Sequence, residues 1–381
     1  MVPLSATAAH ARRELLDRAT RAGDAEGLFR VTSERLRQLV PFDAAVWLAS
    51  DPATGLPTEA ARTEEVGSFG TDGCRRYWEL EFMVEDVNAF TALARAQAPA
   101  AGLRLATDDR PARSARFRDL LRPSGFSDEL RGVLRAGGSP WGLLALFRAH
   151  GEPPFDEHDS ALVSGLSAPL AGALRDHARP AAQPLVAPSQ SGPGLMLFAP
   201  TGELVSINDD ALAWLDELAG DVADPDAFAV PLPTIVVGTL MRARAIAEER
   251  ERGSARARVK SRVTGSWLVC HASCLRDADG DLGNTALVIE PAQAAEITPI
   301  ITQAYELTRR EQQITQRIAR GLGTADIARE LFLSTHTVRD YVKTIFDKVG
   351  VSSRGELVAT LFAAQYPASP PGAEAHARAG A

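Results

Sequence analysis

The sequence predicts a multidomain chain in which two α+β domains precede an all-α domain of four short helices. Three observations support this fold class. Apolar, β-rich runs separated by turn residues occur twice, over 42–148 and 195–289, and helical apolar stripes accompany each set. A proline-rich stretch over 179–194 separates the two sets, which is typical of an interdomain linker. From 307 onward the chain shows only helical patterns.

Composition supports globular cores, because 45% of the 381 residues are hydrophobic. The net charge of −8 is divided unevenly: 306–366 holds nine Lys or Arg against seven Asp or Glu, hence +2, which leaves −10 for the remainder. Three scattered cysteines favour a reducing compartment over a disulfide framework. No charged n-region with a following apolar run and no stretch of roughly 18 apolar residues occurs, so we expect a cytoplasmic protein without a membrane segment.

The first domain, over 1–178, opens with two helices that are broken at Ala22–Asp24. Strands at 42–49 and 58–66, a helix over Tyr77–Ala94, a short helix at 117–123, strands at 128–135 and 141–148, and a closing helix at 156–177 are expected to follow. This order resembles the GAF fold, whose members sense small molecules. Six aromatic residues either line an internal pocket or fill a core: Trp47, Tyr77, Trp78, Phe82, Phe126 and Trp141.

The second domain, over 195–292, begins with a strand pair at 195–198 and 203–207, after which Asn208 starts a helix. A hairpin of 256–263 and 266–275 and a last strand at 284–289 complete it. The order resembles a PAS domain. Members of that family bind haem, flavin or nothing, and the flavin cysteine motif is not recognisable here, so we expect no cofactor.

One segment of the second domain places thiols and an imidazole close together: Cys270, His271 and Cys274. On a strand the two cysteines face one side and the histidine faces the other, which disfavours a shared metal. We expect packing thiols, with redox sensing as the alternative, and no metal. No Walker lysine loop, Gly-x-Ser-x-Gly or His-Glu-x-x-His occurs, so we expect no enzyme.

The C-terminal domain, over 307–366, carries helix-start signals at two places. Thr308 with Glu311 and Ser353 with Glu356 each fit a capping box. Between these two starts, Gly321 and Gly323 stop the first helix, Thr324 caps a second through Leu331, and Ser334 caps a third that runs to Gly350.

The third of these helices is amphipathic. Val338, Val342, Ile345 and Val349 form one apolar stripe, so His336, Arg339, Asp340 and Lys343 point outward. A helix with outward cations after a tight turn is what helix-turn-helix proteins place in the DNA major groove. A solvated helical bundle explains the same spacing.

A resemblance favours DNA. Leu307-Thr308, Arg310-Glu311, Gly321, Ile327-Ala328, Leu331, Ser334, Thr337-Val338, Lys348, Gly350-Val351 and Arg354 resemble the signature of the LuxR-type helix-turn-helix family. Family members commonly have His-Leu where this chain has Tyr341-Val342. The resemblance implies duplex DNA as a partner and these contact residues: Ser334, Thr335, Thr337, Val338, Arg339, Asp340, Tyr341, Lys343 and Lys348.

A connector over 293–306 joins the second domain to the third, and we expect it to be helical with Pro299 in its first turn. Its stripe of Ile297, Ile300, Ile301 and Tyr305 and the last helix are two candidate surfaces for a homodimer. Residues 367–381 are expected to form a disordered tail.

The sequence therefore indicates a one-component transcriptional regulator. Its expected partners are DNA, a second copy, RNA polymerase and a small-molecule ligand. The alternative is a protein-interaction module that keeps the helix-turn-helix fold without binding DNA. A further alternative is that both N-terminal domains only support dimerisation.

Overall fold

A computed structural model of the chain describes residues 6–70, 72–179, 192–219, 232–261 and 264–362. The chain divides into two compact units. The first comprises Met1–His177, Ser191–Val263 and Leu268–Pro291, and the second comprises Ala178–Gln190, Thr264–Trp267 and Ala292–Ala381. Most of the predicted linker (180–191) and the predicted tail lie outside the described residues, and the predicted domain boundaries stay predictions.

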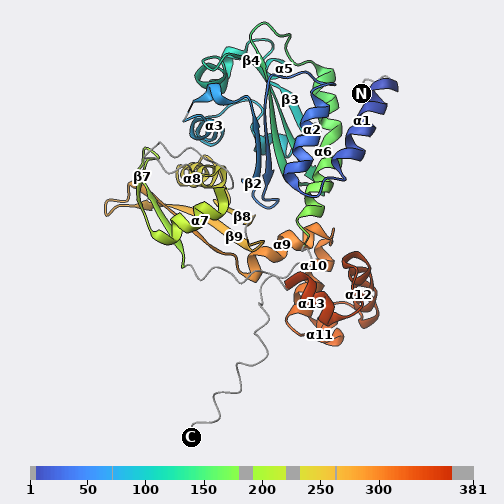
Figure 1. Cartoon of the computed structure of the whole chain (residues 1–381). Coiled ribbons are helices and arrows are strands. Elements are labelled where there is room, and N and C mark those ends of the chain that lie inside the picture. The colour runs from blue at the N-terminus through green and yellow to red at the C-terminus, as the bar shows by residue number, and fades with distance from the viewer. Residues whose placement is uncertain (1–5, 71, 180–191, 220–231, 262–263, 363–381) are drawn as a thin grey trace. The chain divides into compact units, whose positions relative to one another are not determined.

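The first unit begins with a five-stranded antiparallel sheet in the order β2-β1-β5-β4-β3. Its strands are β1 (Ala44–Ser50), β2 (Pro57–Glu64), β3 (Ala100–Gly102), β4 (Phe126–Ala136) and β5 (Ser139–Ala149). Helices α1 (Ala6–Ala19), α2 (Ala25–Leu36) and α6 (Glu157–His177) pack together along it (Figure 1). The predicted opening helices, central strands and closing helix are confirmed.

The predicted helix over Tyr77–Ala94 is wrong, because the chain forms α3 (Gly73–Phe82) and a separate α4 (Phe90–Leu93). Between them Asn88 adopts a left-handed conformation with φ of 55°. The break turns the carbonyl groups of Val87 and Asn88 toward two buried arginines of the same domain. The helical turn Phe117–Leu121 was predicted. The prediction did not include four other short elements: β3, α5 (Leu103–Ala106) and the 3-10 turns Gly67–Phe69 and Pro111–Arg113.

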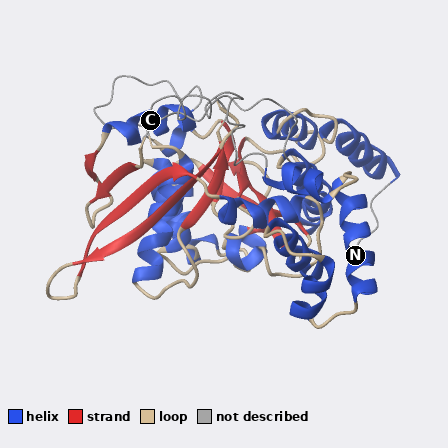
Figure 2. Ribbon diagram, turned by 90° about the horizontal axis from the view of Figure 1, so that it is seen from below, coloured by secondary structure: helices blue, strands red, loops and turns tan. Residues whose placement is uncertain are grey.

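The first unit also contains a second five-stranded sheet, in the order β7-β6-β10-β9-β8. Its strands are β6 (Gly194–Phe198), β7 (Leu204–Ile207), β8 (Arg256–Lys260), β9 (Trp267–Arg276) and β10 (Leu282–Pro291). Helices α7 (Asp209–Ala219) and α8 (Thr234–Ala247) accompany it. Both sheets are red in Figure 2 and their helices are blue. The likeness of this sheet to a PAS domain stays a prediction.

The two sheets of the first unit meet through a buried ion pair. Asp51, in the turn between β1 and β2, accepts hydrogen bonds from the backbone N–H of Arg258 at 2.8 Å and from its Nε at 2.7 Å. Since β8 is an edge strand, Asp51 satisfies a backbone donor that a free edge would leave unpaired. Gly238 of α8 packs so closely on Pro57 that a Cβ there would lie 2.9 Å from the proline ring.

The second unit is helical. It contains α9 (Ala294–Ala304), α10 (Arg309–Ala319), α11 (Thr324–Leu331), α12 (Thr335–Val349) and α13 (Arg354–Phe362). The four predicted C-terminal helices are confirmed, and so is the helical connector, which is α9. Pro299 lies in the interior of α9 rather than in its first turn, so its position was predicted wrongly. Gln293 and Glu296 form a capping box that starts this helix upstream of the proline.

Candidate nucleic-acid interface

Helix α10 begins as the sequence predicts. Thr308 accepts a hydrogen bond from the Glu311 backbone N–H at 3.4 Å, and the Glu311 carboxylate accepts one from the Thr308 N–H at 2.6 Å. The second predicted box forms only in part. Ser353 accepts from the Glu356 N–H, but the Glu356 carboxylate accepts from the N–H of Ser352, one residue earlier than predicted.

Helix α11 and the turn after it differ from the prediction at one residue. Gly323, not Thr324, is the N-cap, and the Thr324 hydroxyl instead accepts a hydrogen bond from Arg354 at 2.8 Å. Arg354 also donates to the Leu322 carbonyl oxygen, so it holds the start of α11 against α13. The turn places Phe332 in the left-handed region with φ of 55°, and its side chain is 96% exposed.

Helix α12 follows this turn with its apolar stripe facing inward. Ser334 caps it by accepting from the Thr337 backbone N–H at 3.0 Å, and Gly350 ends it with φ of 76°, both as predicted. Val338, Ile345 and Val349 are buried. Burial of this stripe fixes which residues of α12 face solvent.

The outward face of α12 is the candidate DNA-reading surface, which we define as Arg339, Asp340 and Lys343. All three are exposed. In the described part of the chain, neither Arg339 nor Lys343 has a hydrogen bond or ion pair. Asp340 lies 2.9 Å from the imidazole of His336, four residues earlier. Two cations are therefore available to an external acceptor.

The other predicted contact residues occupy different settings. Ser334 and Thr335 are exposed at the helix start, while Thr337 and Tyr341 are half-buried. Val338 is wholly buried and supports the helix from within the domain.

Lys348 is engaged inside the domain. Its Nζ donates to the Glu311 carboxylate at 2.7 Å and to the Glu306 carbonyl oxygen at 3.0 Å. Burial tends to raise the pKa of Glu311, but the hydrogen bonds from Lys348 and Thr308 outweigh burial and lower it. The last turn of α12 is thereby tied to the start of α10.

Comparison with known proteins identifies two parts of the chain. The family model "Bacterial regulatory proteins, luxR family" matches residues 305–361, and the GAF domain model matches residues 24–174. The chain carries a GAF domain and a LuxR-type helix-turn-helix domain.

Individual relatives cover only parts of the chain. A probable HTH-type transcriptional regulator, GfsR of Streptomyces halstedii, is 30% identical over 174 residues, which are 44% of this chain and 63% of GfsR. The uncharacterized transcriptional regulatory protein YhcZ of Bacillus subtilis is 40% identical over 62 residues, which are 16% of this chain and 28% of YhcZ. The chain thus spans less than two thirds of either relative.

Among solved structures, the GAF domain of an Acinetobacter phosphoenolpyruvate-protein phosphotransferase is 11% identical to this chain. The match covers 47% of this chain and all of that one, with a TM-score of 0.33.

The interior of the GAF domain contains a cluster of buried charges that the sequence reading missed. We define it as Glu81, Arg116, Glu129 and Arg131. Arg131 donates to Glu81 at 2.7 Å, and Arg116 donates to Glu129 at 2.7 Å. Arg131 also lies 3.7 Å from the centre of the Phe90 ring. The signal in the sequence was the alternation of Glu129 and Arg131 along a strand, which places both on one face.

The six aromatic residues of the GAF domain do not share one pocket. Trp47 stacks on Phe29 of α2, with ring centres 6.0 Å apart, and is fully buried. Trp78 and Phe82 line a cavity of about 230 Å³ together with Arg242 of α8. Two of the six rings, those of Trp78 and Phe82, thus line a cavity, and the alternative of an internal aromatic pocket stays a prediction. Most of the six rings are buried in the core, which agrees with the second of the two alternatives, core filling.

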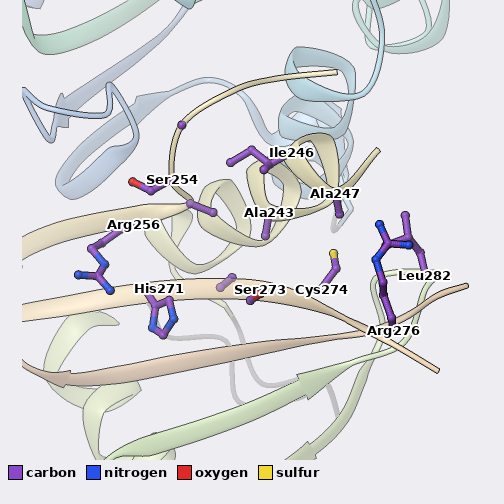
Figure 3. A pocket seen from close by; sticks show the side chains of 13 residues that line it. Ala243, Ile246, Ala247, Ser254, Arg256, His271, Ser273, Cys274, Arg276 and Leu282 are labelled. Atoms are coloured by element: carbon purple, nitrogen blue, oxygen red, sulfur yellow. The ribbon is translucent and has the colours of Figure 1, made fainter. Parts of the chain in front are cut away.

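The second sheet has a larger hollow of about 530 Å³ between α8 and strands β8 and β9 (Figure 3). Small side chains such as Ala243 and Ala247 face Cys274 across it, and Arg256 and Arg276 lie at opposite ends. Its lining residues also include Ile246, Gly253, Ser254, Ala255, His271, Ala272, Ser273 and Leu282.

The strand geometry expected for the cysteines is confirmed. Cys270 pairs with Ile289 and His271 with Val288, so the thiols of β9 lie on one face and the imidazole on the other. Burial raises the pKa of the Cys270 thiol to about 12. Among the described residues, no three His, Cys, Asp or Glu side chains gather as metal ligands.

Proposed function

We propose that this chain is a transcriptional regulator that binds duplex DNA through α12. The observation that carries the proposal is the pair of exposed cations, Arg339 and Lys343, without partners in the described chain, on a helix whose other face is buried. The match of the LuxR family over 305–361 supports it. A solvated bundle would not require this combination.

We assign Arg339, Asp340 and Lys343 to base edges, because they are exposed and lie before the last turn of α12. Ser334, Thr335, Thr337 and Lys348 contact phosphates, which position the helix without reading sequence. For Lys348 this requires a phosphate to share an ammonium group that already donates to Glu311. Tyr341 completes the proposed contact set at the less exposed side of the helix. Val338, the other residue expected from the sequence, is fully buried, so it supports α12 from within the domain and does not contact DNA.

The test starts from the full chain and a random-sequence duplex library. The unchanged chain should enrich a preferred duplex, with affinity that falls as salt rises by a log–log slope of about −0.9 for each neutralised phosphate. Lys343→Ala should weaken binding to that duplex by about 1–3 kcal/mol and relax its discrimination. Arg122→Ala, an exposed arginine of the GAF domain, is the matched control. No enrichment, or affinity that is flat with salt, would refute the proposal.

The regulator acts as a homodimer, because one small domain with few base contacts gives too little specific affinity. The connector stripe is not the free surface that the sequence suggested. Ile297, Ile300 and Ile301 are at most 2% exposed, and α9 packs against α13 within the second unit. The remaining candidate is the half-exposed face of α13 around Val358 and Ala359. Val358→Glu should convert a dimer to a monomer in analytical ultracentrifugation, and an unchanged dimer would exclude this surface.

A small molecule controls the regulator, and the hollow of the second sheet is its candidate site. Its volume of about 530 Å³ falls within the range of ligand pockets. The positive charge of Arg276 at one end of the hollow, whose guanidinium donates to the neutral carbonyl oxygen of Gly280, favours an anionic ligand. Thermal-shift screening of anionic metabolites should find a stabilising compound whose effect is lost in Ala247→Trp. Scaffolding alone predicts that no compound changes stability or DNA affinity.

RNA polymerase is the protein partner that we propose for the turn between α11 and α12. Phe332 is 96% exposed, and an apolar ring held in a left-handed conformation gains little within its own domain. Phe332→Asn keeps a residue that tolerates this conformation. It should lower transcription from a bound promoter without changing DNA affinity. Equal transcription would exclude this contact.

This role involves no catalysis and no cofactor, and we place the protein in the cytoplasm, where its DNA lies. None of the described helices is both long and apolar enough to cross a membrane. The relatives named above are described as transcriptional regulators.

A further inference from the structure

The last turn of α9 is held by a residue from a distant part of the sequence. Arg179 lies two residues beyond the end of α6, the closing helix of the GAF domain. Its Nε donates to the carbonyl oxygen of Ala304, the last residue of α9, at 3.0 Å. Carbonyl groups at a helix end lack partners within the helix, and a cation is favoured beside them. Arg179 supplies both a donor and a positive charge.

The guanidinium group makes a second contact on the next residue. It lies 5.3 Å from the centre of the Tyr305 ring, which is itself 8% exposed. A cation over an aromatic face is attracted by the ring, more so where water is excluded. Arg179 therefore contacts two consecutive residues, Ala304 and Tyr305, at the end of α9.

The residue after Tyr305 is held by a different element, α12. Glu306 has φ of 54°, a left-handed conformation that costs about 1 kcal/mol or more for a non-glycine residue. Its carbonyl oxygen accepts the hydrogen bond from Lys348, in the last turn of α12. The same ammonium group reaches Glu311 at the start of α10. The strained turn thus connects Arg179 to the DNA-reading helix through three consecutive residues.

We propose that Arg179 is a positioning residue for DNA binding, which holds α12 in place through the last turn of α9, Glu306 and Lys348. This route does not pass through the second sheet. Arg179 follows α6 closely in the chain. His177, two residues earlier, lies in the first unit, where its Nε2 is 3.1 Å from the Ala22 carbonyl oxygen.

The inference rests on the proposed DNA-binding function, so its test has one arm without DNA. Hydrogen exchange is measured on the full chain, on Arg179→Ala, on Arg179→Lys and on the control Arg122→Ala. Arg179→Ala should speed exchange of the Tyr305, Glu306 and Leu307 amides by about tenfold, because the local opening of this turn costs less free energy. Arg179→Lys keeps a donor for the Ala304 carbonyl and should restore most of the protection. Unchanged exchange in Arg179→Ala would overturn the proposal.

The second arm measures affinity for the duplex that the unchanged chain enriches from the random library. Arg179→Ala should weaken binding about three- to tenfold, with Arg179→Lys in between and Arg122→Ala unchanged. Combining Arg179→Ala with Lys348→Met should cost less than the sum of the two single losses, since both act on one chain of contacts.

Two results of this arm overturn the proposal. The contacts of Arg179 with Ala304 and Tyr305 are called the clamp. Additive losses of affinity, or an affinity of Arg179→Ala equal to that of the control, would show that the clamp does not position α12. If the unchanged chain enriches no duplex, the proposed function fails and the positioning role fails with it, whereas the exchange arm still reports whether the clamp forms.

Discussion

The two sheets of the first unit share one strand order but differ in what fills the space beneath their helices. In both, the second strand in sequence is at one edge and the third is at the other. Beneath α3 the first sheet holds the charge cluster, whereas beneath α8 the second sheet holds apolar side chains and a hollow lined by small residues. The strand order of a five-stranded sheet of this kind therefore does not decide whether it has space for a ligand. The residues on one face of two strands decide it.

The difference has a physical basis. A guanidinium and a carboxylate that are removed from water must satisfy each other in fixed geometry, so the cluster leaves little freedom to open. Alanines opposite Cys274 leave a space that requires no such geometry. We therefore expect substitutions in the charge cluster of the first sheet to lower the free energy of unfolding strongly. Substitutions of residues that line the hollow of the second sheet should lower it less.

The largest effect is expected for Arg131→Met in the GAF domain. Removing the arginine leaves Glu81 buried without its ion pair, which should cost about 3–5 kcal/mol of unfolding free energy. Denaturant unfolding of the full chain, followed by Trp fluorescence, measures this, with Arg122→Met as the exposed control. A loss of unfolding free energy below about 1 kcal/mol would contradict a charge cluster in which each buried charge depends on its partner.

A smaller loss is expected where the two sheets meet. Arg258→Met removes the two guanidinium hydrogen bonds to Asp51, a carboxylate that is 1% exposed, and leaves it only the backbone N–H donors of residues 53 and 258. Hydrogen bonds to charged groups contribute about 1.5–3 kcal/mol. We expect a loss of this size and a split of one unfolding transition into two, seen by calorimetry. A single, equally cooperative transition would show that the sheets are coupled by other contacts.

How far the sequence predicted this fold depended on whether a signal was local. Capping residues such as Thr308 and Ser334 act within three residues, and the apolar stripe of α12 within one helix, so the helices of the LuxR-type domain were predicted closely. The break at Asn88 was not predicted, because it is stabilised by Arg116 and Arg131 from other elements. A pattern within one segment cannot predict a hydrogen bond from an arginine of a distant segment.

The candidate site shows the same division. Exposure of Arg339 and Lys343 followed from helical periodicity alone. The engagement of Lys348 by Glu311 and the clamp by Arg179 did not, since each joins residues that are far apart in sequence. The connector stripe was predicted as a free surface for a related reason: periodicity identifies an apolar face but not what covers it.

A difference in local packing should also appear between two glycine substitutions, one at a tightly packed position of the first sheet and one at an open position of the second. In Gly142→Ala on β5, the new Cβ would lie 2.8 Å from the Leu174 side chain and 3.1 Å from the Leu48 carbonyl oxygen, so we expect a loss of about 1–3 kcal/mol. In Gly283→Ala on β10, the nearest atom would be 3.7 Å away, and the unfolding free energy should change little. Equal losses of unfolding free energy in denaturant unfolding would contradict this difference in packing between the two positions.

The smallest effect concerns which cysteine of β9 reacts. Cys270 is fully buried and its pKa is about 12, so at pH 9 only about one thiol in a thousand is ionised, and raising the pH from 7 to 9 should not make it react. Cys274 is half-buried and lines the hollow. In a Cys74→Ser chain, iodoacetamide should therefore label Cys274 first, as peptide mass spectrometry can show. Ala243→Phe, which fills the hollow from α8, should slow that labelling and leave Cys270 unlabelled. Labelling of both cysteines at one rate would mean that the sheet opens as a whole, and the hollow would then not be a feature of the folded domain.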